Sequence, residues 1–305
     1  MNKQRIYIAG QEGMVGSAVY KLLKKKHNII DCKRKSLDLL SQSAVDLWFK
    51  KNNIDVVINC AGRVGGILEN SLRKEKFLND NILIGFNLIN SSLKYKAKQF
   101  INLGSACIYP KTTALPIDEN HLLQSKLETT NEGYAIAKIA TLKYCEYLYV
   151  HRNLNYVSLQ PSNLFGFNDN YDLKSSHVIP ALIRKFHEAK INNHKTVEVW
   201  GKKNTTRDFL FSEDIANLIS FILNKKIDYP YINVGSGVET SIGDLVKIII
   251  KIIGYKGNYY FNINKPSGQK RRLLSTKKLL TLGWKPKFSL ENGLIKYYKW
   301  FKKNY

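Results

Sequence analysis

The chain has 305 residues, of which 44% are hydrophobic, and a formal net charge of +24 at pH 7. This length and composition exclude a chain too small or too polar to bury a core, and indicate one large domain or two closely joined ones. The positive charge attracts anions such as nucleic acid, acidic membranes or phosphorylated small molecules. Because the lysines are scattered and accompany no nucleic-acid recognition motif, we expect no nucleic-acid binding.

The four cysteines, at positions 32, 60, 107 and 145, form no C-x-x-C pair. Their spacing predicts no metal site and no disulfide framework, and favours a reducing compartment. The N-terminal apolar run is too short for a signal peptide, and no run is long enough to cross a membrane. We therefore expect a cytoplasmic protein without a membrane partner.

The first predicted elements are a buried strand at Arg5–Ala9, a glycine-rich turn and a helix that ends near Lys24. Gly10 allows a tight turn, Gly13 lets the backbone approach a pyrophosphate, and Gly16 permits close packing of helix on strand. The N-terminus of the helix offers free N–H groups to phosphates. A βα turn without a ligand is the alternative, but the flanking strand and helix favour a dinucleotide site.

A second strand ends near Asp31, where a dinucleotide fold contacts the adenine ribose. An acid at this place suits the 2′-hydroxyl of NAD, and a basic group suits the 2′-phosphate of NADP. Asp31 therefore favours NAD, whereas Lys33, Arg34 and Lys35 together favour NADP, and we give the basic cluster more weight. Lys33 and Lys35 alternatively belong to a solvated loop.

The chain continues with alternating strands and helices. We expect helices at 43–51 and about 71–94, and strands at 55–60, 99–103 and 156–160. This alternation predicts an α/β fold with a doubly wound, largely parallel Rossmann sheet. Small residues at 61–66, directly after the third strand, allow close approach to a nicotinamide.

The pattern loosens after Pro161. Here we expect helices to about 190, at 212–223, at 242–253 and at the C-terminus, with strands at 197–200 and 232–235. We assign 1–163 to an NADP-binding Rossmann domain, to which the chain returns at about 207–235. Residues 164–206 and 236–305 then form a smaller C-terminal α/β lobe that binds substrate.

Between the fourth and fifth strands, Glu132 marks the first turn of a helix, where the helix dipole favours negative charge. Tyr134 and Lys138 share one face of this helix, about 6 Å apart along its axis. A neighbouring ammonium favours the phenolate, so we expect the pKa of Tyr134 to lie below its usual value of about 10. Such a phenol exchanges a proton with a ketone or alcohol near neutral pH. An ordinary amphipathic helix is the alternative.

Together these segments resemble the extended short-chain dehydrogenase/reductases over nearly the whole chain, and most closely the GDP-L-fucose synthase family. The Gly-x-x-Gly-x-x-Gly turn and the Tyr-x-x-x-Lys pair are common to the superfamily, whereas the segments 104–111 and 176–182 are specific to that family. The resemblance implies NADPH-dependent C4 reduction, with C3/C5 epimerisation, of a GDP-linked 4-keto-6-deoxy sugar for surface polysaccharide. It also implies a homodimer, in which helices 71–94 and 134–150 form a four-helix bundle.

The resemblance also assigns catalytic roles. Ser105 would bind the C4 oxygen of the sugar, Tyr134 would protonate it, and Lys138 would hold the nicotinamide ribose. Cys107 and His177 would be the acid/base pair of the epimerisation, since a C4 ketone acidifies the hydrogens at C3 and C5 and inversion needs a group on each side. The alternative is that Cys107 is a packed residue and His177 an ordinary loop residue.

Two further sets of residues follow from the same resemblance, and neither contains a metal ligand. The cofactor set is Gly10, Gly13, Met14, Val15, Gly16, Arg34, Ala61, Gly62, Leu103, Tyr134, Lys138, Pro161, Asn163, Leu164 and His177. The substrate set is Ser105, Ala106, Cys107, Asn163, Val178, Leu182, Lys185, Trp200, Arg207 and Arg272. The planar guanidinium groups of Arg207 and Arg272 suit a diphosphate, and Trp200 suits a base or ribose.

The sequence departs from the family pattern at several places. Gln11 and Glu12 stand where the family usually has His-Arg, and Glu12 would repel a 2′-phosphate. Ala106 replaces a serine, Gly133 a proline and Ser275 an acid. The alternatives are a C4 reductase without epimerisation, acting on a GDP-4-keto-6-deoxyheptose, and, from another class, a non-catalytic module that senses NADP.

Overall fold

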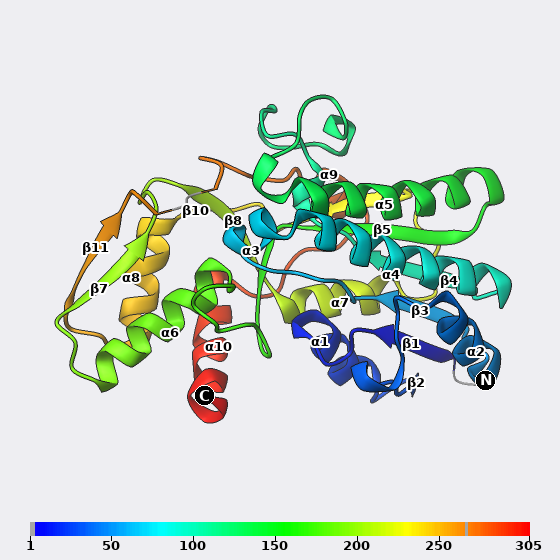
Figure 1. Ribbon diagram of the computed structural model, residues 1–305, viewed down its shortest axis with the longest axis horizontal. Coiled ribbons are helices and arrows are strands. Elements are labelled where there is room, and N and C mark those ends of the chain that lie inside the picture. The colour runs from blue at the N-terminus through cyan, green and yellow to red at the C-terminus, as the bar shows by residue number, and fades with distance from the viewer. Residues whose placement is uncertain (1–3, 266–267) are drawn as a thin grey trace.

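A parallel sheet forms the centre of the larger part of the molecule (Figure 1). The computed structural model describes residues 4–265 and 268–305. The strands of this six-stranded sheet run in the order β2-β1-β3-β4-β5-β9, and every neighbouring pair is parallel. Their bounds are β1 Arg5–Ala9, β2 Asn28–Ile30, β3 Val56–Asn59, β4 Gln99–Leu103, β5 Asn155–Pro161 and β9 Tyr231–Val234. The predicted doubly wound parallel sheet is confirmed.

Helices cover both faces of this sheet (Figure 1). One face carries α1 (Met14–Leu23) and α7 (Ser212–Ile222), and the other carries α2 (Gln42–Asn52), α4 (Lys74–Lys94) and α5 (Glu132–Arg152). The position of β1 inside the sheet, with both faces covered, explains why residues 6–9 are all apolar. Ile6 and Ile8 enter the core under α1 and α7, whereas Tyr7 enters the core under α2, because successive side chains of a strand point to opposite faces.

A smaller lobe packs against the carboxyl ends of the strands, on the left of Figure 1. Its core is aromatic and aliphatic, and a parallel pair of strands lies beside it. A second, three-stranded sheet in the order β10-β8-β6 connects the two parts. The elements are β6 Asn163–Phe165, α6 Val178–Ile191, β7 Thr196–Trp200, β8 Thr206–Phe211, β10 Glu239–Ser241, α8 Ile242–Ile253, β11 Asn258–Asn262, α9 Lys277–Thr281 and α10 Leu290–Asn304.

The predicted helix at 71–94 is wrong at its start. The chain forms two helices, α3 (Ile67–Leu72) and α4, which are separated at Arg73, whose φ of −133° and ψ of 41° are not helical. Tertiary contacts hold α3 at its own angle. The hydroxyl of Ser71 donates to the Thr130 carbonyl at 3.3 Å, and α5 begins so close to the break that a Cβ on Gly133 would lie 2.4 Å from the Lys74 carbonyl oxygen.

Candidate active site

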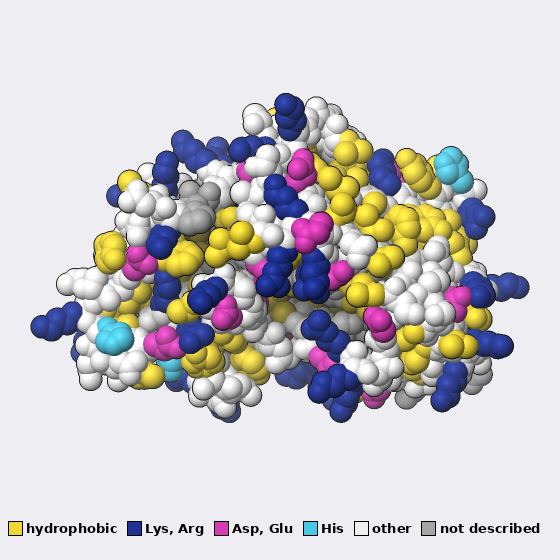
Figure 2. Space-filling view, in the orientation of Figure 1, with side chains coloured by type: hydrophobic (Ala, Val, Ile, Leu, Met, Phe, Trp, Pro, Cys, Tyr) yellow, Lys and Arg dark blue, Asp and Glu magenta, His cyan; other side chains and the backbone are white. Residues whose placement is uncertain are grey.

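A cavity of about 1170 Å³ lies between the carboxyl edge of the sheet and the smaller lobe. Lys and Arg side chains gather around this hollow in the space-filling view (Figure 2). Every residue predicted for catalysis, cofactor or substrate lines the cavity except Gly16 and Ala106. Gly16 instead packs inside α1, and Ala106 is buried behind the wall, where its carbonyl accepts a hydrogen bond from Arg272. The other predicted residues therefore lie together in one cavity.

The glycine-rich turn leaves room for a diphosphate. Gly10 has a φ of +77°, and a Cβ there would lie 2.9 Å from the backbone of Ala61. A Cβ on Gly16 would lie 2.0 Å from the Gly10 carbonyl oxygen, so α1 packs on β1 only with glycine at that position. Gly13, Met14 and Val15 bring the first turn of α1 to the cavity wall. The turn fits the diphosphate of a dinucleotide, which helix N–H groups bind.

Tyr134 and Lys138 lie in the first turns of α5, beside the end of β4. The Lys138 Nζ is 5.7 Å from the ring centre of Tyr134 and donates to the Leu103 carbonyl at 2.9 Å. Burial lowers the pKa of Lys138 to about 8. Burial also raises the pKa of Tyr134, and the hydroxyl of Ser105 opposes this rise only in part. The expected lowering of the tyrosine pKa is therefore wrong for the protein alone, because desolvation outweighs the ammonium.

Ser105 and Cys107 are held by a short 3-10 turn (Ala106–Ile108) directly after β4. The backbone N–H of Ser105 donates to Gln160 Oε1 at 2.9 Å, and Ser105 Oγ accepts from the Cys107 N–H at 3.2 Å. Asn131 Nδ2 donates to Cys107 Sγ at 3.2 Å. Asn131 Oδ1 and Gln160 Nε2 are buried without a hydrogen-bond partner in the protein.

His177 lies on the other lobe, immediately before α6, and is exposed to the cavity. The surrounding protein lowers its pKa by desolvation, which favours the neutral imidazole that a base requires. Cys107 and His177 therefore line one cavity from two different lobes.

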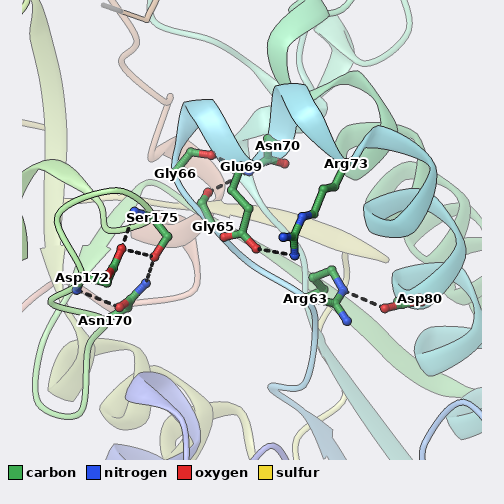
Figure 3. Close-up of polar contacts among 10 residues, drawn as sticks. All are labelled: Arg63, Gly65, Gly66, Glu69, Asn70, Arg73, Asp80, Asn170, Asp172 and Ser175. Carbon is green, nitrogen blue, oxygen red and sulfur yellow. Dashed lines mark hydrogen bonds and ion pairs between the residues drawn. The ribbon is translucent and has the colours of Figure 1, made fainter.

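Two loops meet across the cavity just before His177 (Figure 3). The Gly66 N–H donates to the Ser175 carbonyl at 2.7 Å, and we call this contact the Gly66–Ser175 bridge. The Asn70 side chain donates to the carbonyl of Gly66 at 3.1 Å, and Asp172 accepts from the Ser175 N–H at 3.0 Å. Both loops are thus ordered by their own side chains, and the bridge fixes the separation of the two lobes at this point.

The far end of the cavity holds two half-buried arginines. Arg207 donates to the carbonyls of Thr206 at 2.6 Å and Gln269 at 2.7 Å, and Arg272 Nε donates to Gln269 Oε1 at 2.8 Å. Neither arginine has a carboxylate partner in the part of the chain that the structure describes. Burial lowers the pKa of Arg207 to about 10, and burial also lowers the pKa of Arg272. Two unpaired cations at one wall favour an anionic ligand such as a diphosphate.

Trp200, with 38% of its surface exposed, lies at the same end. Its indole N–H donates to Glu198 at 2.6 Å, and the ammonium groups of Lys185 and Lys265 lie 4.8 and 5.2 Å from its ring centre. Asn163, Val178 and Leu182 also line the cavity.

The comparison with protein families agrees with this arrangement. A family model for the NAD dependent epimerase/dehydratase family matches residues 6–235. The chain belongs to this family. Over 305 residues it is 43% identical to a GDP-L-fucose synthase of Sinorhizobium fredii, covering all of this chain and 97% of that protein.

Solved structures of the family are also similar to the whole chain. A GDP-6-OMe-4-keto-L-xylo-heptose reductase from Campylobacter jejuni has a TM-score of 0.93 and 29% identity, with 100% of this chain and 99% of that chain covered. A GDP-mannoheptose C4 reductase from Campylobacter jejuni with NADP bound has a TM-score of 0.91 and 31% identity, with 99% of each chain covered. The resemblance drawn from the sequence is confirmed at the level of the family.

The sequence analysis did not predict a role for several residues that contact the side chains of this site. Gln160 places Ser105, Asn131 contacts the thiol of Cys107, and Gln269 contacts both arginines. Gln160 has a recognisable signal, since it is a polar residue at the end of an otherwise apolar buried strand. Gln269 has none, because its role depends on the path of a long loop. Within the described ranges, no group of His, Cys, Asp and Glu could hold a metal, and no helix could span a membrane.

Proposed function

We propose that the chain is an NADPH-dependent reductase of the C4 ketone of a GDP-linked 4-keto-6-deoxy sugar, with C3/C5 epimerase activity. The observation that carries this proposal is the cavity itself, which brings a Ser-Tyr-Lys set and a Cys-His pair together. A non-catalytic NADP sensor would have no use for these five side chains. The 43% identity to a GDP-L-fucose synthase supports the assignment.

The reduction uses the side chains after β4 and at the start of α5. The cofactor supplies a hydride to C4 when it is bound. Ser105 holds the C4 oxygen by a hydrogen bond, and Tyr134 donates its phenolic proton to that oxygen. The raised pKa of Tyr134 keeps its hydroxyl protonated in the free protein, so the phenol can donate a proton to the C4 oxygen. Lys138 holds the ribose hydroxyls, and its ammonium stabilises the phenolate that forms.

Epimerisation uses the same oxygen subsite. One of the pair Cys107 and His177 removes the proton from C3 or C5, and the electrons of the C–H bond move to the C4 oxygen to give an enolate. Ser105 and Tyr134 stabilise this charge by hydrogen bonds. The other member of the pair returns a proton to carbon from the opposite face, which inverts the centre. Both steps need the C4 ketone, which the reduction removes, so they precede the reduction.

The nucleotide would occupy the far end of the cavity. Arg207 and Arg272 are placed to bind the diphosphate, since they are charged, half-buried and without carboxylate partners. Trp200 offers a partly exposed ring to the base or ribose. Bound in this way, the GDP group holds the sugar against Ser105 and supplies binding energy for its orientation.

A homodimer through α4 and α5 extends the proposal. The outer side of α5 exposes Ile136, Tyr147 and Val150, with 42, 55 and 60% of their surfaces accessible. Figure 2 shows apolar side chains gathered on the right of the molecule, where α4 and α5 lie in Figure 1. Two copies facing each other here would form a four-helix bundle and bury this patch. A cytoplasmic location also remains part of the proposal.

Proton NMR of the reaction with GDP-4-keto-6-deoxymannose and NADPH in D₂O tests the function. A GDP-L-fucose product with deuterium at C3 and C5 is expected, and Cys107→Ser should lose the deuterium at one or both centres. Reduction without deuterium would instead support a C4 reductase alone. Similarity to two heptose reductases favours this second candidate. Turnover of a GDP-4-keto-6-deoxyheptose with NADPH would test it.

A further inference from the structure

The adenine end of the cavity contains a carboxylate among cations. Glu12, Lys33, Arg34 and Lys35 line the same end of the cavity, and Glu12 is exposed there. The Glu12 side chain does not point away into solvent. Its Oε2 accepts from the backbone N–H of Arg34 at 2.8 Å, which fixes the carboxylate against the segment after β2.

The neighbouring residue of the turn makes a parallel contact. Gln11 Oε1 accepts from the Cys32 N–H at 3.5 Å, so two side chains of the glycine-rich turn hold the chain after β2. Asp31, which the sequence suggested for this place, does not line the cavity. Its carboxylate instead acts on the Tyr20 hydroxyl, whose pKa it raises. Glu12 is therefore the acid at the position where a dinucleotide fold contacts the adenine ribose.

The two signs of charge have opposite consequences for the cofactor. A carboxylate at this place accepts a hydrogen bond from a ribose 2′-hydroxyl and repels a 2′-phosphate, whereas basic side chains attract the phosphate. Glu12 also occupies the Arg34 N–H, a donor that a 2′-phosphate would otherwise use. The three cations keep the site open to a phosphate, and the carboxylate reduces their effect.

We propose that Glu12 determines cofactor specificity in this chain, so that its adenosine site accepts NAD(H) as well as NADP(H). The carboxylate binds the 2′-hydroxyl of NAD(H), and the cations Lys33, Arg34 and Lys35 bind the 2′-phosphate of NADP(H) against its repulsion. This inference rests on the proposed function for the identity of the reaction, but the adenosine site can be tested without any sugar.

Titration calorimetry with 2′,5′-ADP and 5′-AMP isolates the 2′ position. In Glu12→Gln, we expect 2′,5′-ADP to bind about tenfold more tightly and 5′-AMP to change less than twofold, since one unit charge is removed from the neighbourhood of a phosphate. Glu12→Ala should in addition weaken 5′-AMP several-fold, because it has no acceptor for the hydroxyl. Asp31→Asn is the matched control, as it removes a nearby carboxylate outside the cavity and should change neither ligand.

An unchanged ratio of the two affinities in Glu12→Gln would overturn the inference. An equal change in Glu12→Gln and Asp31→Asn would overturn it as well, since that result indicates a general charge effect. Turnover adds a second measurement: kcat/KM with NADH should lie within about tenfold of that with NADPH in the unaltered enzyme, and Glu12→Gln should widen the gap about tenfold. If the sugar were not turned over while the calorimetry came out as expected, the proposed reaction alone would fail.

Discussion

Gly66→Ala tests whether the Gly66–Ser175 bridge sets the position of His177. The backbone of Gly66 has a φ of −68° and a ψ of 179°, which alanine adopts without strain. The added Cβ would nevertheless lie 2.9 Å from the Ser176 carbonyl oxygen and 3.1 Å from that of Ser175. An ordinary contact begins near 3.4 Å, so the two oxygens must move by about 0.5 and 0.3 Å.

Such a movement displaces the segment that leads directly into His177. A 1 Å misplacement of a reacting group reduces a rate by about a hundredfold, so about half that distance predicts roughly a tenfold loss. The loss should affect proton exchange at carbon, which uses His177, more than hydride-dependent reduction, which uses the other lobe. Hydrogen–deuterium exchange at C3 and C5 of the keto sugar, followed by NMR with NADP⁺ in place of NADPH, measures the first step alone.

Gly65→Ala is the matched control, because it makes the same substitution one residue earlier. Its Cβ would lie 2.4 Å from Glu69 Oε2, the end of a side chain that can turn away, and 3.2 Å from the ring of Phe77, and neither neighbour belongs to the segment before His177. We expect exchange within about twofold of the unaltered enzyme for this variant. Equal exchange rates in Gly66→Ala and the unaltered enzyme would refute the reasoning, as would an equal loss in both variants.

Three further changes have defined outcomes. Tyr134→Phe should lower kcat for NADPH oxidation by about 10²- to 10⁴-fold, while calorimetry shows a far smaller change in NADP⁺ binding; full turnover would disprove the proton-donor role. Lys138 has a pKa of about 8 when folded against about 10.4 unfolded, so at this group the unfolded chain binds more protons between these values, and the contribution of Lys138 to stability rises with pH there. Lys138→Met removes this contribution, so the difference in unfolding free energy between the unaltered protein and the variant should rise by about 2.5 kcal/mol from pH 7 to pH 10, and a difference that does not change with pH would refute the assignment. Tyr147→Glu should convert a dimer to a monomer in sedimentation, whereas Lys174→Glu, far from that surface, should not.

Local periodicity accounts for what the sequence predicted well. The strands of the parallel sheet are short apolar runs between turns. The three glycines belong to one turn and the helix that follows it, and Tyr134 and Lys138 belong to one helix, so both patterns can be read locally. Strands β6 and β10 went unrecognised because they have only three residues each, and β11 (Asn258–Asn262) because it begins and ends with asparagine and none of its residues is fully buried. Such strands are stabilised by their partners rather than by their own residues.

Properties that depend on distant contacts could not be predicted. The pKa of Tyr134 depends on its burial in the folded protein, and the proximity of Lys138 along the helix predicted the opposite direction of the shift. The carbonyl that accepts from Arg272 belongs to a residue 166 positions earlier in the chain. Glu12 and Arg34 are 22 positions apart, and only the fold shows that this acid, rather than Asp31, faces the cavity.

Helix α5 carries two features of the molecule at once. It runs without interruption through Glu132–Arg152, a rod about 30 Å long, with Tyr134 in its first turn and the exposed stripe of Ile136, Tyr147 and Val150 along its outer side. A force applied to the stripe therefore reaches the phenol through helical backbone alone, with no loop to absorb it. A partner that contacts the outer side of α5 would therefore also affect the position of the Tyr134 hydroxyl in the cavity.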